Sequence, residues 1–309
     1  MPTGPVPTGP VPAGPVLSDV KLARLAGSRF AQVVQLAETT STNSVLVGKA
    51  EGGAPEGMVL VADYQTAGRG RFERRWESPA GKSLLFSVLL RPSREELPPH
   101  RRHLAVAAVS LALVEAARDV ANVEVQLKWP NDLIVGSVMA GDATAGDATA
   151  GDATAGDATA GDATAGDRKV AGVLAEATSD GAIVVGAGVN VSWAPEPHEG
   201  PGAPAATCLE AVAGRPVPRD EVLVSALLAL DRLYGHWGLV SGLYRQRCST
   251  IGRKVTVSFA GHQPDLVGTA LAVDEDGRLV VRDVDGGTVT VAAGDVTHAR
   301  GLSGPSLGD

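Results

Sequence analysis

Cysteine is nearly absent from this chain of 309 residues, which has only Cys208 and Cys248 and no Cys-x-x-Cys pair. Neither a disulfide framework nor a cysteine-ligated zinc site is therefore expected, and a reducing compartment, the cytoplasm, is the default location. The N-terminus lacks the charged start and apolar core of a signal peptide, and no apolar run reaches the 18 residues needed to span a bilayer. We therefore expect a cytoplasmic protein with no membrane partner.

An excess of positive charge is also lacking. Lys and Arg total 27 against 35 Asp and Glu, which gives a formal net charge of −8. Because attraction to phosphate backbones needs a basic face, nonspecific binding of nucleic acid is disfavoured. The cations are instead concentrated between Arg69 and Arg102. The length predicts about two domains, and the 44% hydrophobic content is enough for ordinary cores.

Large side chains are missing from two low-complexity segments. Residues 2–16 repeat a Pro- and Gly-rich five-residue unit, and residues 141–165 repeat Gly-Asp-Ala-Thr-Ala five times. A pentapeptide β-helix needs a large apolar residue in each unit, so we expect a disordered tail at 1–17 and a flexible insert at 139–167. Lengthening a turn from about 4 to about 34 residues costs only roughly 2 kcal/mol, so the surrounding fold should tolerate the insert.

The remaining pattern predicts strands mixed with a few helices, an α+β fold with a mixed β-sheet at 18–249. Helical spacing occurs over 100–120 and from Asp220 onward, and His100 and His103 at the first helix start are expected on the surface or in a capping role. Strand-like runs lie at 32–37, 58–64, 84–91, 123–128, 132–135, 169–174 and 182–191. Four short alternating strands follow within 250–303, and 304–309 is a tail.

The most informative segment runs from Gln65 to Trp76 and holds four arginines and two glycines. Glycine permits close backbone approach, and the planar arginine fork matches carboxylate and phosphate oxygens. The segments Lys128–Asp132 and Arg168–Gly172 add further cations. Together the three segments predict a site that brings two anions within bonding distance.

These segments, together with Ser41-Thr42-Asn43 and Gly186–Asn190, resemble the biotin protein ligase family, in the family's order over roughly residues 30 to 300. The resemblance implies a catalytic domain related to class II aminoacyl-tRNA synthetases, followed by a small SH3-like β-barrel. It further implies the monofunctional type, because only about 30 residues precede the first expected core strand and leave no room for a DNA-binding domain.

The reaction that the resemblance implies has two steps. The carboxylate of biotin attacks the α-phosphate of ATP, giving biotinyl-AMP and pyrophosphate, and a lysine of a carrier protein then takes the biotinyl group. The implied cofactors are ATP, biotin and Mg²⁺. The implied partner is the biotin carboxyl carrier domain of acetyl-CoA carboxylase or a related carboxylase, and a weak homodimer is also expected. Both reactants of the first step are anions, so fixed positive charge is needed and no covalent enzyme nucleophile is.

The resemblance also implies roles for individual residues. The catalytic cations are Arg71, Lys128 and Lys169. Hydrogen bonds to the biotin ring come from Ser41, Thr42, Asn43 and Gln65. The carboxylate of biotin and the phosphate are covered by Arg69, Gly70, Arg71 and Lys169. On the nucleotide side lie Arg74, Trp76, Lys128, Asn131 and Asp132, and Asp132 is a candidate Mg²⁺ ligand. The other implied ligand-binding residues are Gly172 and Asn190, and Asn190 is expected to contact a ribose or phosphate.

Several of these assignments have alternatives. Ser41-Thr42-Asn43 can cap a helix, alone or in addition to binding a ligand, and Gly186 and Gly188 fit a tight bend or bulge equally well. Trp129-Pro130 is expected to pack in the core. For the whole protein, the alternatives are a lipoate or octanoate protein ligase and a biotin-responsive DNA-binding regulator.

Overall fold

The computed structural model describes residues 16–72, 74–136, 166–196, 205–259 and 263–298. The strands of the larger of its two sheets are β1 (Val33–Thr39), β2 (Val59–Gln65), β3 (Ser83–Leu90), β4 (Gln126–Lys128), β5 (Asp132–Val135), β6 (Arg168–Ala177), β7 (Ile183–Asn190) and β8 (Ala205–Ala206). The helices are α1 (Asp19–Arg24), α2 (Thr42–Glu51), η1 (Pro99–Arg101), α3 (Leu104–Ala116), η2 (Ala117–Ala121), α4 (Leu209–Ala213), α5 (Arg219–Leu233) and α6 (Trp237–Arg247).

The large sheet is mixed, as the sequence predicts. Its order is β1-β2-β3-β7-β6-β5-β4, with β8 added beside β6. The pairs β1–β2 and β6–β8 are parallel, and the other neighbours are antiparallel. The two segments that flank the repeat insert form the antiparallel pair β5–β6, with Asp132 opposite Gly172. The insert therefore lies in the connection between two paired strands.

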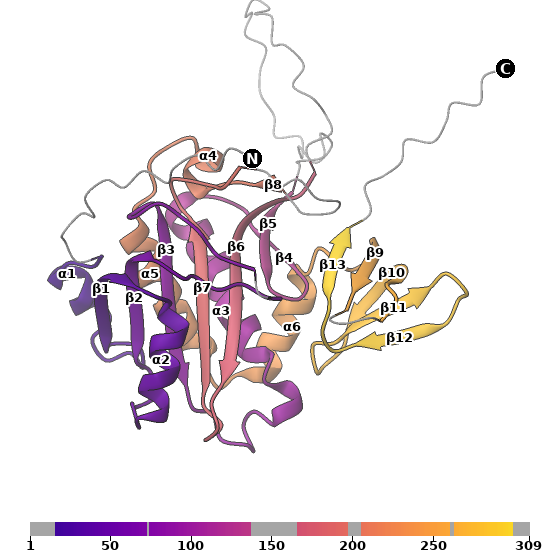
Figure 1. Ribbon diagram of the computed structural model, residues 1–309, viewed down its shortest axis with the longest axis horizontal. Coiled ribbons are helices and arrows are strands. Elements are labelled where there is room, and N and C mark those ends of the chain that lie inside the picture. Colours follow the sequence, from indigo (N-terminus) through magenta and orange to yellow (C-terminus); the bar gives the residue numbers. More distant parts are fainter. Residues whose placement is uncertain (1–15, 73, 137–165, 197–204, 260–262, 299–309) are drawn as a thin grey trace, which may run out of the picture.

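Alternating residues of the central strands build two apolar layers. Val59 and Val61 of β2 face the core that contains α3 and α5, whereas Leu60 packs in a smaller cluster with Leu46 of α2. Helices α3, α5 and α6 thus cover one face of the sheet, and α2 covers part of the other (Figure 1). This alternation follows from the period of two in a strand. The face that carries α2 is therefore covered by helix only in part.

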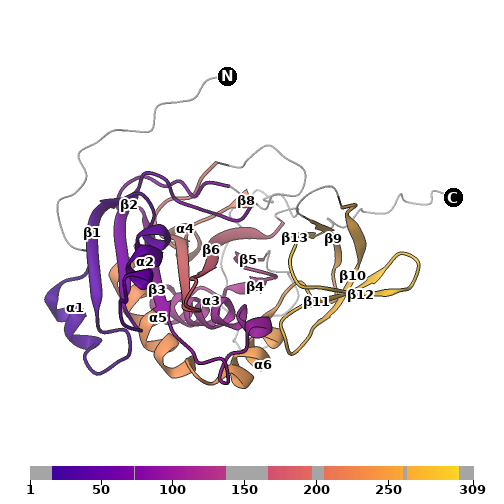
Figure 2. The ribbon, with the colours of Figure 1, turned by 60° about the horizontal axis from the view of Figure 1, so that its bottom comes forward.

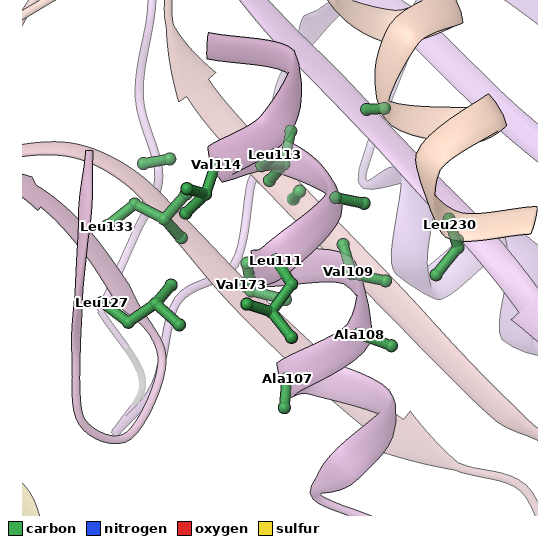
Figure 3. Close-up of a cluster of buried hydrophobic side chains, with 14 of the residues drawn as sticks. Ala107, Ala108, Val109, Leu111, Leu113, Val114, Leu127, Leu133, Val173 and Leu230 are labelled. Atoms are coloured by element: carbon green, nitrogen blue, oxygen red, sulfur yellow. The ribbon is translucent and has the colours of Figure 1, made fainter. Parts of the chain in front are cut away.

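Helix α3 is the centre of the main core. Eleven of its thirteen residues are buried, and it packs against α5 and α6. Figure 3 shows Leu111 of α3 on the side facing Leu127 of β4, with Leu230 of α5 on the other side of the helix. The helix predicted over 100–120 is thus α3, preceded by the 3₁₀ turn η1 and continued by the π-helical turn η2.

The C-terminal sheet contains β9 (Lys254–Ser258), β10 (Leu266–Val273), β11 (Leu279–Asp283), β12 (Thr288–Val291) and β13 (Asp295–His298). All its pairs are antiparallel, in the order β12-β11-β10-β9-β13. The sequence predicted the first four strands and missed β13. A small separate β domain is confirmed, although no pairing among the described residues closes it into the expected barrel.

The two sheets meet along β4, α6 and the turn before β11 (Figure 2). Trp129 is 3% exposed, and its indole nitrogen donates to the carbonyl of Gly277 at 2.9 Å. Ser241 and Arg101 both donate to the carbonyl of Glu275, at 3.3 and 3.2 Å. The prediction that Trp129 packs in the core is confirmed, and the residue also joins the two domains.

Three expectations need correction or lie outside the described residues. Val16 and Leu17, assigned to the disordered tail, are buried, and Leu17 exchanges two hydrogen bonds with Gln35. The rest of that tail, residues 304–309 and the repeat insert up to residue 165 are not among the described residues. His103 is half-buried and makes no capping hydrogen bond, because it packs against Gly277 of the C-terminal domain.

Candidate active site

A cavity of about 130 Å³ opens on the sheet face that carries α2. Its walls come from the start of α2, the end of β2, the loop between β2 and β3, and the middle of β6 and β7. It brings together thirteen predicted site residues, namely Ser41, Thr42, Asn43, Gln65, Arg69, Gly70, Arg71, Arg74, Trp76, Asn131, Asp132, Lys169 and Gly172. The predicted segments, which are scattered over more than 130 residues, therefore converge on one site.

One end of the cavity is neutral and polar. Gln65 Oε1 accepts hydrogen bonds from the Thr42 amide at 2.7 Å and from the Thr42 hydroxyl at 3.1 Å. The Gln65 side-chain NH₂ group has no acceptor among the described residues. Ser41 caps α2, with its oxygen accepting from the Ser44 amide at 3.5 Å, so its hydroxyl hydrogen also stays available. The capping interpretation is confirmed, and it leaves two donors for a ligand.

Asn43 is buried beneath this end and is fully used by protein partners. Its amide donates to the carbonyl of Leu174 at 3.2 Å and to Glu176 Oε1 at 3.1 Å, and its oxygen accepts from Ser87 at 2.6 Å. The second oxygen of Glu176 accepts from Arg69 at 2.7 Å. Because an amide has two N–H groups, Asn43 has no donor left for a ring. Its position is therefore that of a support for the cavity wall.

The other end of the cavity is charged. Lys169 Nζ lies 2.6 Å from Asp132 Oδ1 and 5.7 Å from the ring centre of Trp76. The indole N–H of Trp76 is buried and has no hydrogen-bond partner among the described residues. A buried donor without an acceptor is costly, so a ligand oxygen there would be stabilising. This end can therefore receive a phosphate or carboxylate between Lys169 and Trp76.

Two arginines of the loop reach the C-terminal domain. Arg71 Nη1 donates to Asn131 Oδ1 at 3.3 Å and to the carbonyl of Gly294 at 3.0 Å, while Arg74 pairs with Asp295. Burial lowers the pKa of Arg71, against the raising effect of Asp295 and Asp132. An arginine remains charged despite such a shift. The charged end is therefore shared between two domains.

Two predicted residues lie off the cavity wall. Lys128 is 6% exposed, and its ammonium makes no ion pair or hydrogen bond within the described ranges. Burial lowers its pKa, chiefly against the charge of Asp132. Asn190 is 2% exposed and donates to the carbonyl of Thr207 at 3.0 Å. One N–H group of Asn190 therefore supports the backbone at Thr207, while its side-chain oxygen has no partner among the described residues, and the ribose or phosphate contact stays a prediction.

Gly186 and Gly188 are explained by close approach and not by a bend. Both lie inside the regular strand β7 on the cavity face. A Cβ at Gly186 would come 2.1 Å from Asn43 Oδ1, and one at Gly188 would come 2.4 Å from the Trp76 ring. Such distances are sterically impossible. Each glycine therefore makes room for one end of the cavity.

The sequence reasoning missed Ser87, Glu176 and Asp295. Ser87 is a fully buried hydroxyl in the middle of a strand whose other residues after Ser83 are all apolar, and that polar interruption was a usable signal. Glu176 lies on the same strand as Lys169, and it continues the cavity-facing alternation of Gly172 and Leu174. Asp295 had no signal, because its partner Arg74 lies 221 residues away.

Few carboxylates of the cavity could bind Mg²⁺ directly. No cluster of three or more His, Cys, Asp or Glu that could hold a metal occurs in the part of the chain that the structure describes. Mg²⁺ is commonly bound by one or two carboxylates together with substrate phosphates. Asp132, with the Asn131 amide beside it, fits that mode, in which the ion enters with the nucleotide.

None of the helices in the described ranges is long and apolar enough to cross a membrane.

The cavity thus has neutral donors at one end and fixed cations at the other, an arrangement that can hold a small organic acid beside a phosphate group. Residues 36–192 match the model of the biotin/lipoate A/B protein ligase family, and residues 250–298 match the biotin protein ligase C-terminal domain. The first match alone covers half of the chain. The chain belongs to the biotin/lipoate A/B protein ligase family and is a ligase.

Individual relatives agree with this assignment. The chain is 34% identical over 283 residues to a biotin--[acetyl-CoA-carboxylase] ligase of Mycobacterium tuberculosis, covering 89% of this chain and 92% of the relative. It is 27% identical to the enzyme of the same name from Paracoccus denitrificans, over 84% and 97% of the two chains. Among solved structures, a biotin protein ligase from Aquifex aeolicus in complex with biotin and ATP superposes with a TM-score of 0.65 at 25% identity, covering 87% of this chain and 99% of that one.

Proposed function

We propose that the protein activates biotin with ATP as biotinyl-AMP and transfers the biotinyl group to a lysine of a biotin carboxyl carrier domain. The observation that carries the proposal is the polarity of the cavity, with the free donors of Ser41 and Gln65 at one end and Lys169 and Arg71 at the other. Biotin has the matching shape, a polar ureido ring and a carboxylate separated by an apolar chain. The similarity to the Aquifex aeolicus enzyme with biotin and ATP supports it.

In the first step, a biotin carboxylate oxygen bonds to the α-phosphorus, and the bond to pyrophosphate breaks. Lys169 and Arg71 then offset the negative charge that two anions bring together. The bond between Lys169 and Asp132 must be exchanged for one to the ligand, and Asp132 is then free to face an ion that accompanies the nucleotide. Mg²⁺, when bound, would neutralise phosphate charge.

In the second step, the neutral amine of the carrier lysine attacks the acyl carbon, AMP leaves, and the amine gives up one proton to solvent. No covalent nucleophile of the enzyme itself is required. The exposed side chains of Arg69 and Arg74 lie at the cavity rim, where an incoming carrier must approach. Acetyl-CoA carboxylase appears in the names of the two relatives above, so its carrier domain is the substrate we propose.

Lipoate is the main competing acid, because the family model includes lipoate ligases. Its dithiolane ring offers no carbonyl oxygen or N–H group to Ser41 and Gln65. A site built to hydrogen-bond a substrate rejects an analogue without the matching groups, because buried polar atoms are then left unpaired. The neutral end therefore favours biotin.

The direct test is incubation of the protein with biotin, ATP, Mg²⁺ and a purified carrier domain, followed by intact mass of the carrier. We expect the mass to rise by one biotinyl group, and no change when the acceptor lysine is replaced by arginine. A parallel reaction with lipoate serves as the matched control. Lipoylation at a rate comparable to biotinylation would overturn the assignment of the acid.

A further inference from the structure

A chain of hydrogen bonds at the domain boundary connects β4, which ends at Lys128, with β6, which contains Lys169. His298 of β13 lies with Nδ1 2.8 Å from Asp167 Oδ2 and Nε2 3.1 Å from Thr250 Oγ1. Arg253 adds a bond to Asp167 Oδ2 at 2.6 Å. The Thr250 hydroxyl oxygen in turn accepts from the backbone N–H of Trp129 at 3.0 Å.

Each end of this chain adjoins a catalytic lysine. Trp129 directly follows Lys128, the last residue of β4. Asp167 directly precedes β6, whose second residue is Lys169. A side chain of the C-terminal domain therefore holds both lysine-bearing strands, which are separated in the large sheet by β5.

With a proton on Nδ1, neutral His298 can donate to the Asp167 carboxylate and accept from the Thr250 hydroxyl, which itself accepts from Trp129. Arg253 Nη1 also lies 3.2 Å from His298 Nδ1, and both groups bond to the same carboxylate oxygen, Asp167 Oδ2. The side chains of His298 and Asp167 are 9% and 14% exposed, so water competes little for these bonds. Bonds to charged groups in such surroundings are stronger than exposed ones.

The order Asp167, His298, Thr250 has the arrangement of a nucleophile relay, but it does not serve as one. Thr250 is completely buried, and its oxygen already accepts a backbone hydrogen bond. No substrate atom can reach it. The chain therefore acts on position and not on a bond of the substrate.

We propose that His298, with Arg253, is a positioning residue that sets the place of Lys128 and Lys169 relative to each other, through Thr250 and Asp167. The inference rests on the proposed function for the role of the lysines. It makes the C-terminal domain part of the adenylation machinery. It also explains how Lys169 keeps its register directly after the long repeat insert, since Asp167 is tied to the other domain.

The test uses His298→Phe, which keeps a ring and removes both hydrogen bonds. We expect the maximal rate of biotin-dependent pyrophosphate release to fall about tenfold, since small misplacements of catalytic groups have large effects. The KM for biotin should not change. In the Lys169→Ala background, His298→Phe should slow the reaction by clearly less than tenfold, because the part of its effect that passes through Lys169 is already lost and coupled residues are not additive. Arg278→Ala, which breaks the Arg278–Asp274 pair of the same domain, is the matched control and should keep the parent rate.

A second measurement does not depend on activity. Amide hydrogen exchange of the protein without substrates should be about tenfold faster over 168–170 and 127–129 in His298→Phe than in the parent. If His298→Phe does not fold, Asp167→Asn, which keeps the shape and removes the charge, takes its place in both assays. Unchanged exchange, a rate within twofold of the parent, or an equal further loss in the Lys169→Ala background would each overturn the proposal. Absence of any biotin-dependent reaction in the parent would instead count against the proposed function, while the exchange result would still decide the positioning role.

Discussion

The two ends of the cavity are built in different ways. At the neutral end, Thr42, Gln65 and Ser87 bond to one another within the large sheet and its helix α2. At the charged end, Arg71 and Arg74 bond to Gly294 and Asp295 of the C-terminal domain. One end is therefore complete within a single domain, whereas the other depends on two. Changes at the domain boundary should affect the phosphate chemistry and leave binding of the acid intact.

The largest effect is expected from Lys169→Ala. Loss of the ammonium removes a charged partner of the developing acyl phosphate, worth about 1.5 to 3 kcal/mol, so pyrophosphate release at saturating ATP should fall roughly 10- to 150-fold. The melting temperature should hardly change, because the side chain is 27% exposed and, among the described residues, forms one ion pair, with Asp132. A rate within threefold of the parent would remove Lys169 from the site.

The next largest effect is expected from two Gly→Ala substitutions, one at each end of the cavity. Gly186→Ala places a methyl group against Asn43, and Gly188→Ala places one against Trp76, two residues along the same strand. We expect the KM for biotin to rise about tenfold in the first variant and the KM for ATP to rise about tenfold in the second. Steady-state kinetics with each substrate varied in turn measures both. If both variants raise the same KM, the division of the cavity is wrong.

Arg71→Gly tests whether the shared end retains the intermediate. Arg71 spans from the β2–β3 loop to Gly294, so its removal opens a covered region of the cavity. Escape of the reactive anhydride should then increase severalfold, as lids normally protect intermediates from water. Labelling of lysines on a bystander protein, seen on a streptavidin blot, reports the escape. An inactive variant, or one that still modifies only the carrier, would contradict the retention role.

A smaller effect is expected at the domain boundary in acid. Burial lowers the pKa of His103 to about 4, against the raising effect of Asp274 and Asp276, while Arg101 lowers it further. Its folded pKa is thus below the unfolded value of 6.5, so the stability that neutral His103 contributes is present above pH 6.5 and is lost as the pH falls toward 4. When the pH is lowered from 7 to 5, the free energy of unfolding of the parent should therefore fall by about 1 kcal/mol more than that of His103→Gln, after allowance for the partial exposure of His103.

Urea unfolding of both proteins at pH 7 and pH 5 measures this difference. The exposed His100, three residues earlier, supplies the matched control His100→Gln. The difference in unfolding free energy between the parent and His103→Gln should change between the two pH values. If it does not change, burial of His103 has no part in the acid sensitivity.

The smallest effect is expected from deletion of residues 141–165. The Gly-Asp-Ala-Thr-Ala unit has no side chain larger than threonine, so the deletion removes loop-closure entropy and no core. Activity should stay within twofold of the parent, with a modest rise in melting temperature. Loss of folded protein on deletion would show that the repeats are structural.

Local patterns were sufficient for much of this molecule. The apolar runs of β2, β3 and β7 and the spacing in α3 and α5 predicted those elements, and the motif segments predicted thirteen residues of the cavity wall. The missed strand β13 is four residues long and ends in charged and polar side chains, so it has little apolar alternation. Contacts such as Arg74 with Asp295 and His298 with Asp167 join residues more than 100 positions apart, and only the packing of the two domains determines them.

The most direct test of the account is to identify the adenylate that the protein holds. The protein is incubated with biotin, ATP and Mg²⁺ but no carrier, separated from free nucleotide, and its bound small molecules are identified by mass spectrometry while pyrophosphate is measured. We predict biotinyl-AMP and pyrophosphate in equal amounts, about one per protein chain, and no corresponding adenylate when lipoate replaces biotin. Pyrophosphate release without biotin, or a lipoyl adenylate formed as readily as the biotinyl one, would contradict the central claim.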